Sequence, residues 1–202
     1  MFLRILLYVM KVRRVLKVDA IELMMEEHKF IKRTLLVIRK MSISVLNGNE
    51  VPYEDYKRVI EFVRNYADKH HHNKEEEILF KKMREDLGEA LAGAPIAGML
   101  VEHDLGRLFM KSLEEALERV KNGDADSKVD IIANSIGYAD LLNRHIEKED
   151  KVIYSFARRA LKEEAMGFVN DSCEKVEALA DKENVQEKYI SILKELEGKW
   201  IK

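Results

Sequence analysis

The sequence is poor in cysteine, proline and glycine, and each shortage narrows the class of protein. Cys173 is the one cysteine in 202 residues, so the chain forms no intramolecular disulfide and no cysteine-cluster zinc or iron–sulfur site. An oxidising compartment is therefore not implied. Two prolines and nine glycines leave long segments without a residue that would interrupt a helix.

Neither sign of charge is in excess. The chain has 35 Lys and Arg against 37 Asp and Glu, a net charge of −2, so it lacks a broad basic field and we expect no nucleic-acid partner. Charged residues form 36% of the chain, too many for a multi-span membrane protein. Hydrophobic residues form 47%, too many for a disordered chain.

Long hydrophobic runs are also missing. The apolar run Ile5–Met10 is too short to span a bilayer and no small-residue cleavage site follows it, so we expect a cytoplasmic protein without a transmembrane segment. Residues 1–18 are predicted to form an amphipathic helix that packs on the body of the protein, with a helix on a membrane surface as the alternative. The length favours one domain, a bundle over residues 19–162 with a helical extension over 163–202.

Helical periodicity dominates the rest of the sequence. Asp19 is a good N-cap with Glu22 three residues later, and apolar residues then recur at steps of three and four up to the Asn47-Gly48-Asn49 stop. Further helices are predicted over 53–86, 95–122 and 126–162, with a last amphipathic stretch over 171–197. Long helices joined by short loops favour an all-α, up-down-up-down four-helix bundle with extra N- and C-terminal helices.

The histidines form an internal repeat. His28 and His71 are 43 residues apart, and His103 and His145 are 42 apart. The segment 71–80 aligns with 145–154, so each half of the bundle has one His on its first helix and a His-x-x-x-Glu on its second. Residues i and i+4 share one helix face, so the Glu of each pair, Glu75 or Glu149, can bind the same metal as its His or bridge two metals.

These side chains are predicted to point inward. His28, His103 and His145 each lie in an apolar helical stripe, and buried charges must be paired or coordinated. A single inward His is usually a hydrogen-bonded core residue. Four inward histidines and two carboxylates that converge at mid-height of an antiparallel bundle instead predict a two-metal site.

The triplet His70-His71-His72 leaves two registers open. His70 has Lys74 at i+4, and the residues before His72 are polar, which favours partly solvated positions for both. His71 has Glu75 at i+4, and the repeat pairs it with His145. We therefore prefer His71 and Glu75 as ligands, with His72 and Glu76 as the alternative register.

The donor types suggest the metal. Imidazole and carboxylate ligands suit iron, manganese or zinc. Two histidines and two shared carboxylates give four protein ligands per ion and leave positions open, which fits iron better than a closed, tetrahedral structural zinc. The prediction is two iron ions, with zinc or manganese as alternatives.

The same residues carry a resemblance to a known family. The segments HHNKEEEILF (71–80), GAPIAGMLVEHD (93–104) and HIEKED (145–150) resemble the hemerythrin-like, or HHE cation-binding, family, and the resemblance covers about residues 19–160. It implies a non-haem di-iron centre with an oxo or hydroxo bridge. At the matching positions stand the histidine ligands His28, His71, His103 and His145 and the bridging carboxylates Glu75 and Glu149.

One departure affects the expected function. Oxygen-carrying hemerythrins use five histidines, whereas this chain offers four at matching positions, so the resemblance supports di-iron binding more firmly than reversible oxygen transport. The predicted function is binding or sensing of dioxygen, nitric oxide or iron. The alternatives are a redox enzyme at the same centre, acting on peroxide or nitric oxide or donating iron for iron–sulfur repair, and a zinc-binding or structural bundle. A homodimer is a further alternative.

Overall fold

A computed structural model describes residues 18–201 of the chain. The helix predicted over residues 1–18 therefore lies outside the described residues, apart from Val18. The described part is helical and contains no strand. None of its helices is both long and apolar enough to cross a lipid bilayer.

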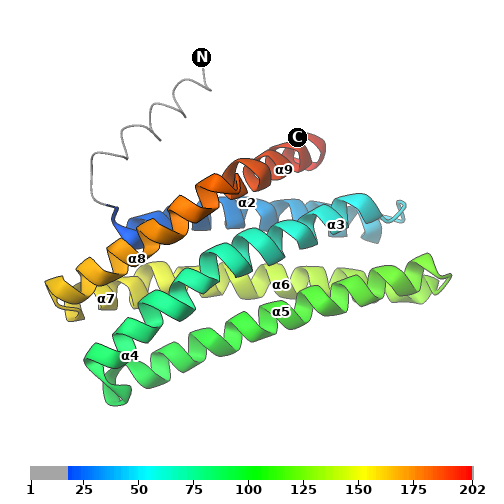
Figure 1. Cartoon of the computed structure of the whole chain (residues 1–202). Helices are drawn as coiled ribbons and strands as arrows, with labels where there is room; N and C mark the ends of the chain where they lie inside the picture. Colours follow the sequence, from blue (N-terminus) through cyan, green and yellow to red (C-terminus); the bar gives the residue numbers. More distant parts are fainter. Residues whose placement is uncertain (1–17, 202) are drawn as a thin grey trace.

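Four antiparallel helical limbs form the body of the molecule (Figure 1). The first limb is α2 (Ala20–Leu46), and the third is α5 (Ala94–Lys121), which follows the short helix η3 (Glu89–Gly93). The second and fourth limbs consist of several consecutive helical segments. The second comprises α3 (Tyr53–Phe62), η1 (Val63–His72), η2 (Glu75–Phe80) and α4 (Lys81–Leu87). The fourth comprises η4 (Ala125–Ser127), α6 (Lys128–Lys148), η5 (Glu149–Ile153) and α7 (Tyr154–Ala160). The predicted all-α bundle is confirmed.

Local signals set the limb boundaries where they were predicted. The Asp19 carboxylate accepts a hydrogen bond from the Glu22 backbone N–H at 3.0 Å and caps α2. Gly48, with φ of 84°, follows the last turn of α2, and Gly123, with φ of 102°, follows that of α5. Only glycine adopts this left-handed conformation without steric strain, so these two glycines end the limbs.

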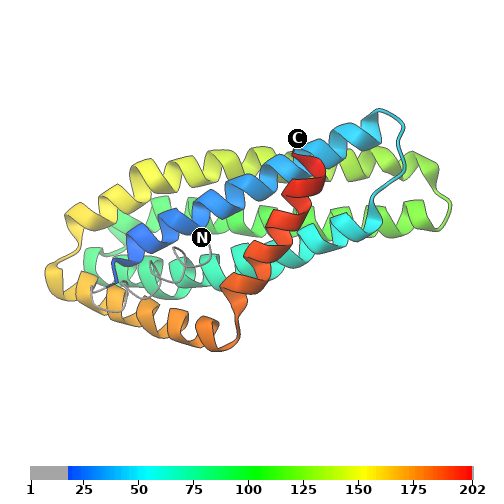
Figure 2. The ribbon, with the colours of Figure 1, turned by 90° about the horizontal axis from the view of Figure 1, so that it is seen from above.

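The C-terminal region differs from the prediction. The single amphipathic stretch expected over 171–197 is two helices, α8 (Glu163–Lys182) and α9 (Val185–Trp200). The chain turns at Asn184, whose φ of 54° lies in the left-handed region that asparagine tolerates better than most residues. Helix α8 packs on α2, η2 and α4, whereas α9 crosses α2 and α3 (Figure 2).

The core consists of two apolar clusters with a polar layer between them. On α2, Met24 belongs to one cluster and Ile31 to the other, and His28 lies between them. The other three limbs repeat this order, so the buried polar residues meet at one level of the bundle. The two limbs that carry the His-x-x-x-Glu motifs are π-helical at this level, in η1, η2 and η5, and such wide turns occur often at functional sites.

Candidate metal centre

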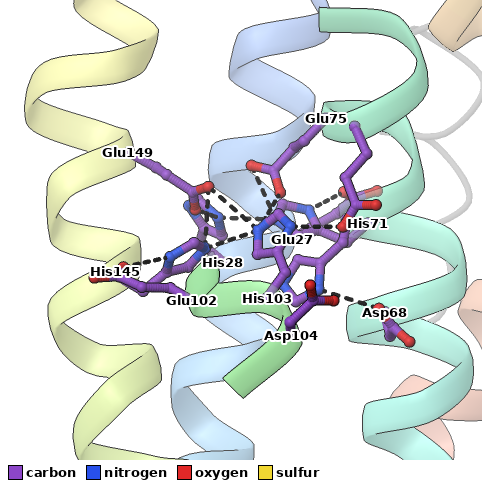
Figure 3. A network of polar contacts seen from close by, with 12 residues as sticks. Glu27, His28, Asp68, His71, Glu75, Glu102, His103, Asp104, His145 and Glu149 are labelled. Atoms are coloured by element: carbon purple, nitrogen blue, oxygen red, sulfur yellow. Dashed lines mark hydrogen bonds and ion pairs between the residues drawn. The ribbon is translucent and has the colours of Figure 1, made fainter. Parts of the chain in front are cut away.

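The polar layer gathers imidazole and carboxylate side chains from all four limbs. Figure 3 shows the labelled histidines and carboxylates of this layer close together between the helices. None of the members is more than 5% exposed: Glu27, His28, His70, His71, His72, Lys74, Glu75, His103, His145 and Glu149. All six residues that were predicted as ligands are therefore brought together here.

Two overlapping groups in this layer have the spacing of metal ligands. Within each group, the ligand atoms lie within 4.8 Å of one another. One group contains His28 and His71, together with Glu75 and Glu149. The other contains His72, His103 and His145 and shares Glu75 with the first.

The two carboxylates lie between the histidine pairs. Glu149 has one oxygen 3.3 Å from His28 Nε2 and the other 3.1 Å from His145 Nε2. Glu75 has its oxygens 3.6 Å from His71 Nε2 and 3.5 Å from His103 Nε2. Each carboxylate thus faces both pairs, as a bridging ligand must.

The far side of each of the four imidazoles predicted as ligands is held by another carboxylate. The Nδ1–H of His71 donates to Glu27 at 2.7 Å, and that of His145 donates to Glu102 at 2.9 Å. Two further bonds of 2.7 Å run from His28 to Asp150 and from His103 to Glu76. A proton on Nδ1 leaves the Nε2 lone pair free to face the centre, which is the usual arrangement behind a metal-bound histidine.

The direction of these hydrogen bonds follows from the charge of the carboxylates. Burial alone would raise the pKa of Glu27, but the Lys74 ammonium and hydrogen bonds from His70 and His71 hold the pKa well below its usual value. The pKa of Glu102 is lowered in the same way, since Lys148 and His145 outweigh its burial. An ionised carboxylate only accepts hydrogen bonds, so the histidine is the donor in each pair.

The inner nitrogens require a cation. His28 Nε2 and His71 Nε2 are 2.9 Å apart, and His103 Nε2 and His145 Nε2 are 3.0 Å apart. Two lone pairs at that distance repel unless a proton or a metal ion lies between them. In the metal-free protein a proton can do this: Asp150 and Glu149 overcome burial and raise the pKa of His28 to about 9, whereas burial and the neighbouring His28 lower that of His71 to about 4.

The two central carboxylates, Glu75 and Glu149, differ in their charge state. Burial and the adjacent Glu149 carboxylate raise the pKa of Glu75 well above its usual value. Burial would also raise the pKa of Glu149, but the surrounding histidines hold it well below the usual value. Among the described residues, neither oxygen of Glu149 accepts a hydrogen bond of good geometry. Buried, unpartnered carboxylate oxygens between imidazole lone pairs are suited to a metal cation.

The internal repeat extends to the residues behind the ligands. Glu27 and Glu102 each precede the histidine of a first helix, and each accepts from the second-helix histidine of its own half. Glu76 and Asp150 each follow a bridging Glu, and each accepts from the first-helix histidine of the other half. The centre therefore has an approximate two-fold symmetry.

His72 breaks this symmetry and corrects an expectation. His70 and His72 were expected to be partly solvated, but each is only 5% exposed. The ring of His72 stacks on that of His103 with centroids 3.9 Å apart. Its equivalent in the other half is the apolar Ile146. The expectation was wrong because neighbouring elements cover these side chains: His70 contacts Glu27 and Glu177, and the ring of His103 covers His72.

Tyr154 is a second asymmetric residue, which the sequence analysis missed. Its hydroxyl donates to Glu75, and its ring stacks on His28. The repeat aligns Tyr154 with Phe80, whose ring stacks in the same way on His103 but has no hydroxyl. The alignment of 71–80 with 145–154 contained this signal, since it places a hydroxyl beside only one half of the centre.

A third acidic group lies behind the centre, and a lysine ammonium already occupies it. Glu27, His70 and Glu177 also have metal-ligand spacing, but the Lys74 ammonium donates to both carboxylates. The Lys74 side chain is fully buried. Helix α8, which brings Glu177, covers that face of η2.

A cavity opens beside the centre on the His72 side. It has a volume of about 300 Å³, and its wall includes the Tyr138 ring. The Tyr138 hydroxyl is buried and makes no hydrogen bond within the described part of the chain. The residues that line the cavity are Val63, Arg64, Asp68, His72, His103, Gly106, Arg107, Met110 and Tyr138.

Fold and site together define a helical bundle with a buried histidine–carboxylate centre for metal cations. The chain belongs to the hemerythrin HHE cation-binding domain family, whose model matches residues 19–157. No curated protein and no solved structure matches the chain. The family implies cation binding, and the free imidazole lone pairs and the unpartnered carboxylate oxygens of this centre fit a metal cation.

Proposed function

We propose that the chain is a di-iron protein that binds or senses a small ligand, such as dioxygen or nitric oxide, or iron itself. The observation that carries the proposal is the convergence of four Nε2 atoms on two shared carboxylates, with every Nδ1 held from behind. A proton between the inner nitrogens, which are 2.9 Å apart, would still leave both Glu149 oxygens without a hydrogen bond from the described residues, whereas a metal cation would give them a partner.

The proposed ligands follow the two groups of side chains. His28 and His71 would hold one ion, and His103 and His145 the other. Glu75 and Glu149 would bridge the two ions. We assign His72 as a fifth nitrogen ligand, on the His103 side, because it belongs to that group, while its Nδ1 lies 3.4 Å from the Asp68 carboxylate behind the ring. One ion would then have three nitrogens, and the other would keep a position for the small ligand.

Iron suits this arrangement better than zinc. A structural zinc site is closed by four ligands in a tetrahedron, whereas here the carboxylates are shared and one ion has fewer protein ligands. Iron when bound would supply a redox couple and an open coordination position. The protein would keep the imidazoles oriented and exclude bulk water, since every proposed ligand is buried. Manganese and zinc remain the competing metals.

The first experiment measures iron per chain in protein purified from iron-supplemented cells, and again after anaerobic reconstitution. We expect about two irons per chain for the wild type. Glu75→Ala removes a bridging carboxylate and should reduce the iron content to one or none. Glu77→Ala changes an exposed residue two positions away and should keep both irons. Stoichiometric zinc alone, or no iron after reconstitution, would refute the di-iron proposal.

A further inference from the structure

We propose that Lys74 and Glu177 are positioning residues of the centre, so that helix α8 is part of the metal site. The inference rests on the proposed function. It assigns a role to a segment beyond the family match, which ends at residue 157.

A chain of contacts leads from α8 to a proposed ligand. Glu177 on α8 accepts a hydrogen bond from the Lys74 ammonium at 2.5 Å. Lys74 also donates to Glu27, on the oxygen that does not face His71. The other oxygen of Glu27 accepts the Nδ1–H of His71 at 2.7 Å. Lys74 thus holds the carboxylate that orients the His71 imidazole.

Burial makes this chain rigid and interdependent. Lys74 is fully buried, and Glu27 is 2% exposed. A buried ammonium is stable only with compensating negative charge, which Glu27 and Glu177 supply. If Glu177 lost its charge, Lys74 would depend on Glu27 alone and would compete with His71 for that carboxylate. The orientation and basicity of His71 would then change.

The C-terminal helices hold Glu177 in place from the other side. Gln186 at the start of α9 donates to the second oxygen of Glu177 at 2.7 Å. Helix α8 packs on α2 and η2, the two segments that carry Glu27 and Glu75. A displacement of α8 would therefore move Glu177 and, through Lys74 and Glu27, change the orientation of His71.

The other half of the bundle provides a matched control. Lys148 is the repeat equivalent of Lys74 and donates to Glu102, which accepts from His145. The Lys148 side chain, however, is 44% exposed, and water can replace its contacts. The same three residue types thus occur twice, but the lysine of one set is buried beneath α8 and the lysine of the other is largely exposed.

The test compares Glu177→Gln, Lys74→Met and Lys148→Met in the full chain, by titrating each metal-free protein with Co²⁺ and following the visible absorption. The wild type should bind two ions. Glu177→Gln and Lys74→Met should weaken one of the two binding steps by about 10- to 100-fold, the usual effect of changing a residue behind a metal ligand. Lys148→Met should change either step by less than about threefold.

Two readouts keep a folding defect apart from a positioning defect. Thermal melting of the metal-free variants shows whether they fold. If Lys74→Met does not fold, the nearly isosteric Glu177→Gln still tests the proposal. Glu177→Asp, which keeps the charge, should recover at least part of the lost affinity. Two binding steps in Glu177→Gln with wild-type affinities, or equal losses in Lys74→Met and Lys148→Met, would overturn the inference. Fewer than two ions in the wild type would instead refute the proposed function.

Discussion

Four imidazoles of the centre each have a carboxylate behind them, and this pairing decides which nitrogen faces inward. Glu27, Glu76, Glu102 and Asp150 accept the outer protons of four histidines. The negative charge behind the ring makes the inner nitrogen a stronger donor to a metal. The metal preference therefore depends on these four carboxylates as well as on the ligands.

The hydroxyl of Tyr154 gives a prediction at the residue scale. Tyr154→Phe removes the one hydroxyl that donates to Glu75 and leaves the aromatic stack on His28 intact. A bridging carboxylate without this donor is oriented less firmly, so metal affinity should fall by about 10-fold or more. A Co²⁺ titration followed by visible absorption measures it.

Tyr138→Phe is the control for that variant. The Tyr138 hydroxyl is buried and, within the described residues, unpartnered, so its removal should leave both Co²⁺ affinities unchanged and should not destabilise the protein. If the two variants behaved alike, the hydrogen bond to Glu75 would not contribute to metal binding.

The single cysteine gives another prediction at this scale. Burial raises the pKa of the Cys173 thiol to about 12, and the side chain is fully buried. The thiolate is the reactive form, so the native protein should react with a disulfide reagent at pH 8 far more slowly than the unfolded chain does. Rapid reaction of the native protein would show that α8 opens readily. Burial also argues against Cys173 as the bond of a disulfide-linked dimer.

At the scale of elements, the π-helical segments decide which residues reach the centre. An α-helical turn presents residues three and four apart on one face, whereas η1 presents three consecutive histidines. The wider turn lets one limb supply His71 to one group and His72 to the other. His71 and His72 both lie inside, with Glu75 central and Glu76 hydrogen-bonded to His103, so this geometry favours Glu75 over Glu76 as the proposed ligand.

The α8–α9 turn allows a test of element geometry. Asn184 has φ of 54°. This left-handed conformation raises the free energy of most L-residues by roughly 1 kcal/mol, whereas glycine adopts it without steric strain. Asn184→Gly should therefore leave the free energy of unfolding within about 0.5 kcal/mol of the wild type, whereas Asn184→Val should lower it by about 1–2 kcal/mol. Urea denaturation of the metal-free proteins measures both. Equal effects of the two substitutions would contradict a left-handed turn.

At the scale of the whole molecule, the bundle divides its core around a charged layer. Two apolar clusters stabilise the ends of the limbs, while the layer between them buries carboxylates that lack good hydrogen bonds. Such a layer destabilises the metal-free fold. The metal-free bundle is thus less stable because of this layer at mid-height, and a bound cation would stabilise it there.

Metal binding should consequently stabilise the whole protein. A ligand that binds only the folded state at 100 times its Kd adds about 2.7 kcal/mol, which corresponds to roughly 5–10 °C in Tm for a chain of this size. Differential scanning calorimetry of the metal-free and metal-loaded wild type measures the shift. The Glu75→Ala variant should show little or no shift, and a shift equal to that of the wild type would place the cation elsewhere.

Much of this architecture follows from local patterns. The Asp19 cap, the stop at Gly48 and the three-and-four spacing of apolar residues predict the limbs, because these signals act within a few residues. The internal repeat predicts that the six proposed ligands converge, because an antiparallel bundle brings equivalent positions of its two halves to one level. The family assignment is confirmed by the match over 19–157, whereas the division at residues 18 and 162 stays a prediction.

The tertiary contacts account for the rest. Whether Lys74 is solvated depends on α8, about a hundred residues away in the chain, and whether His72 is buried depends on its stack with His103 on α5. Neither can be read from periodicity, because burial and charge compensation arise only when distant segments pack. The chain alone thus specifies the bundle and the residue types of its centre. Packing decides that the lysine of one Glu–His–Lys set lies beneath a covering helix while the lysine of the other set faces water.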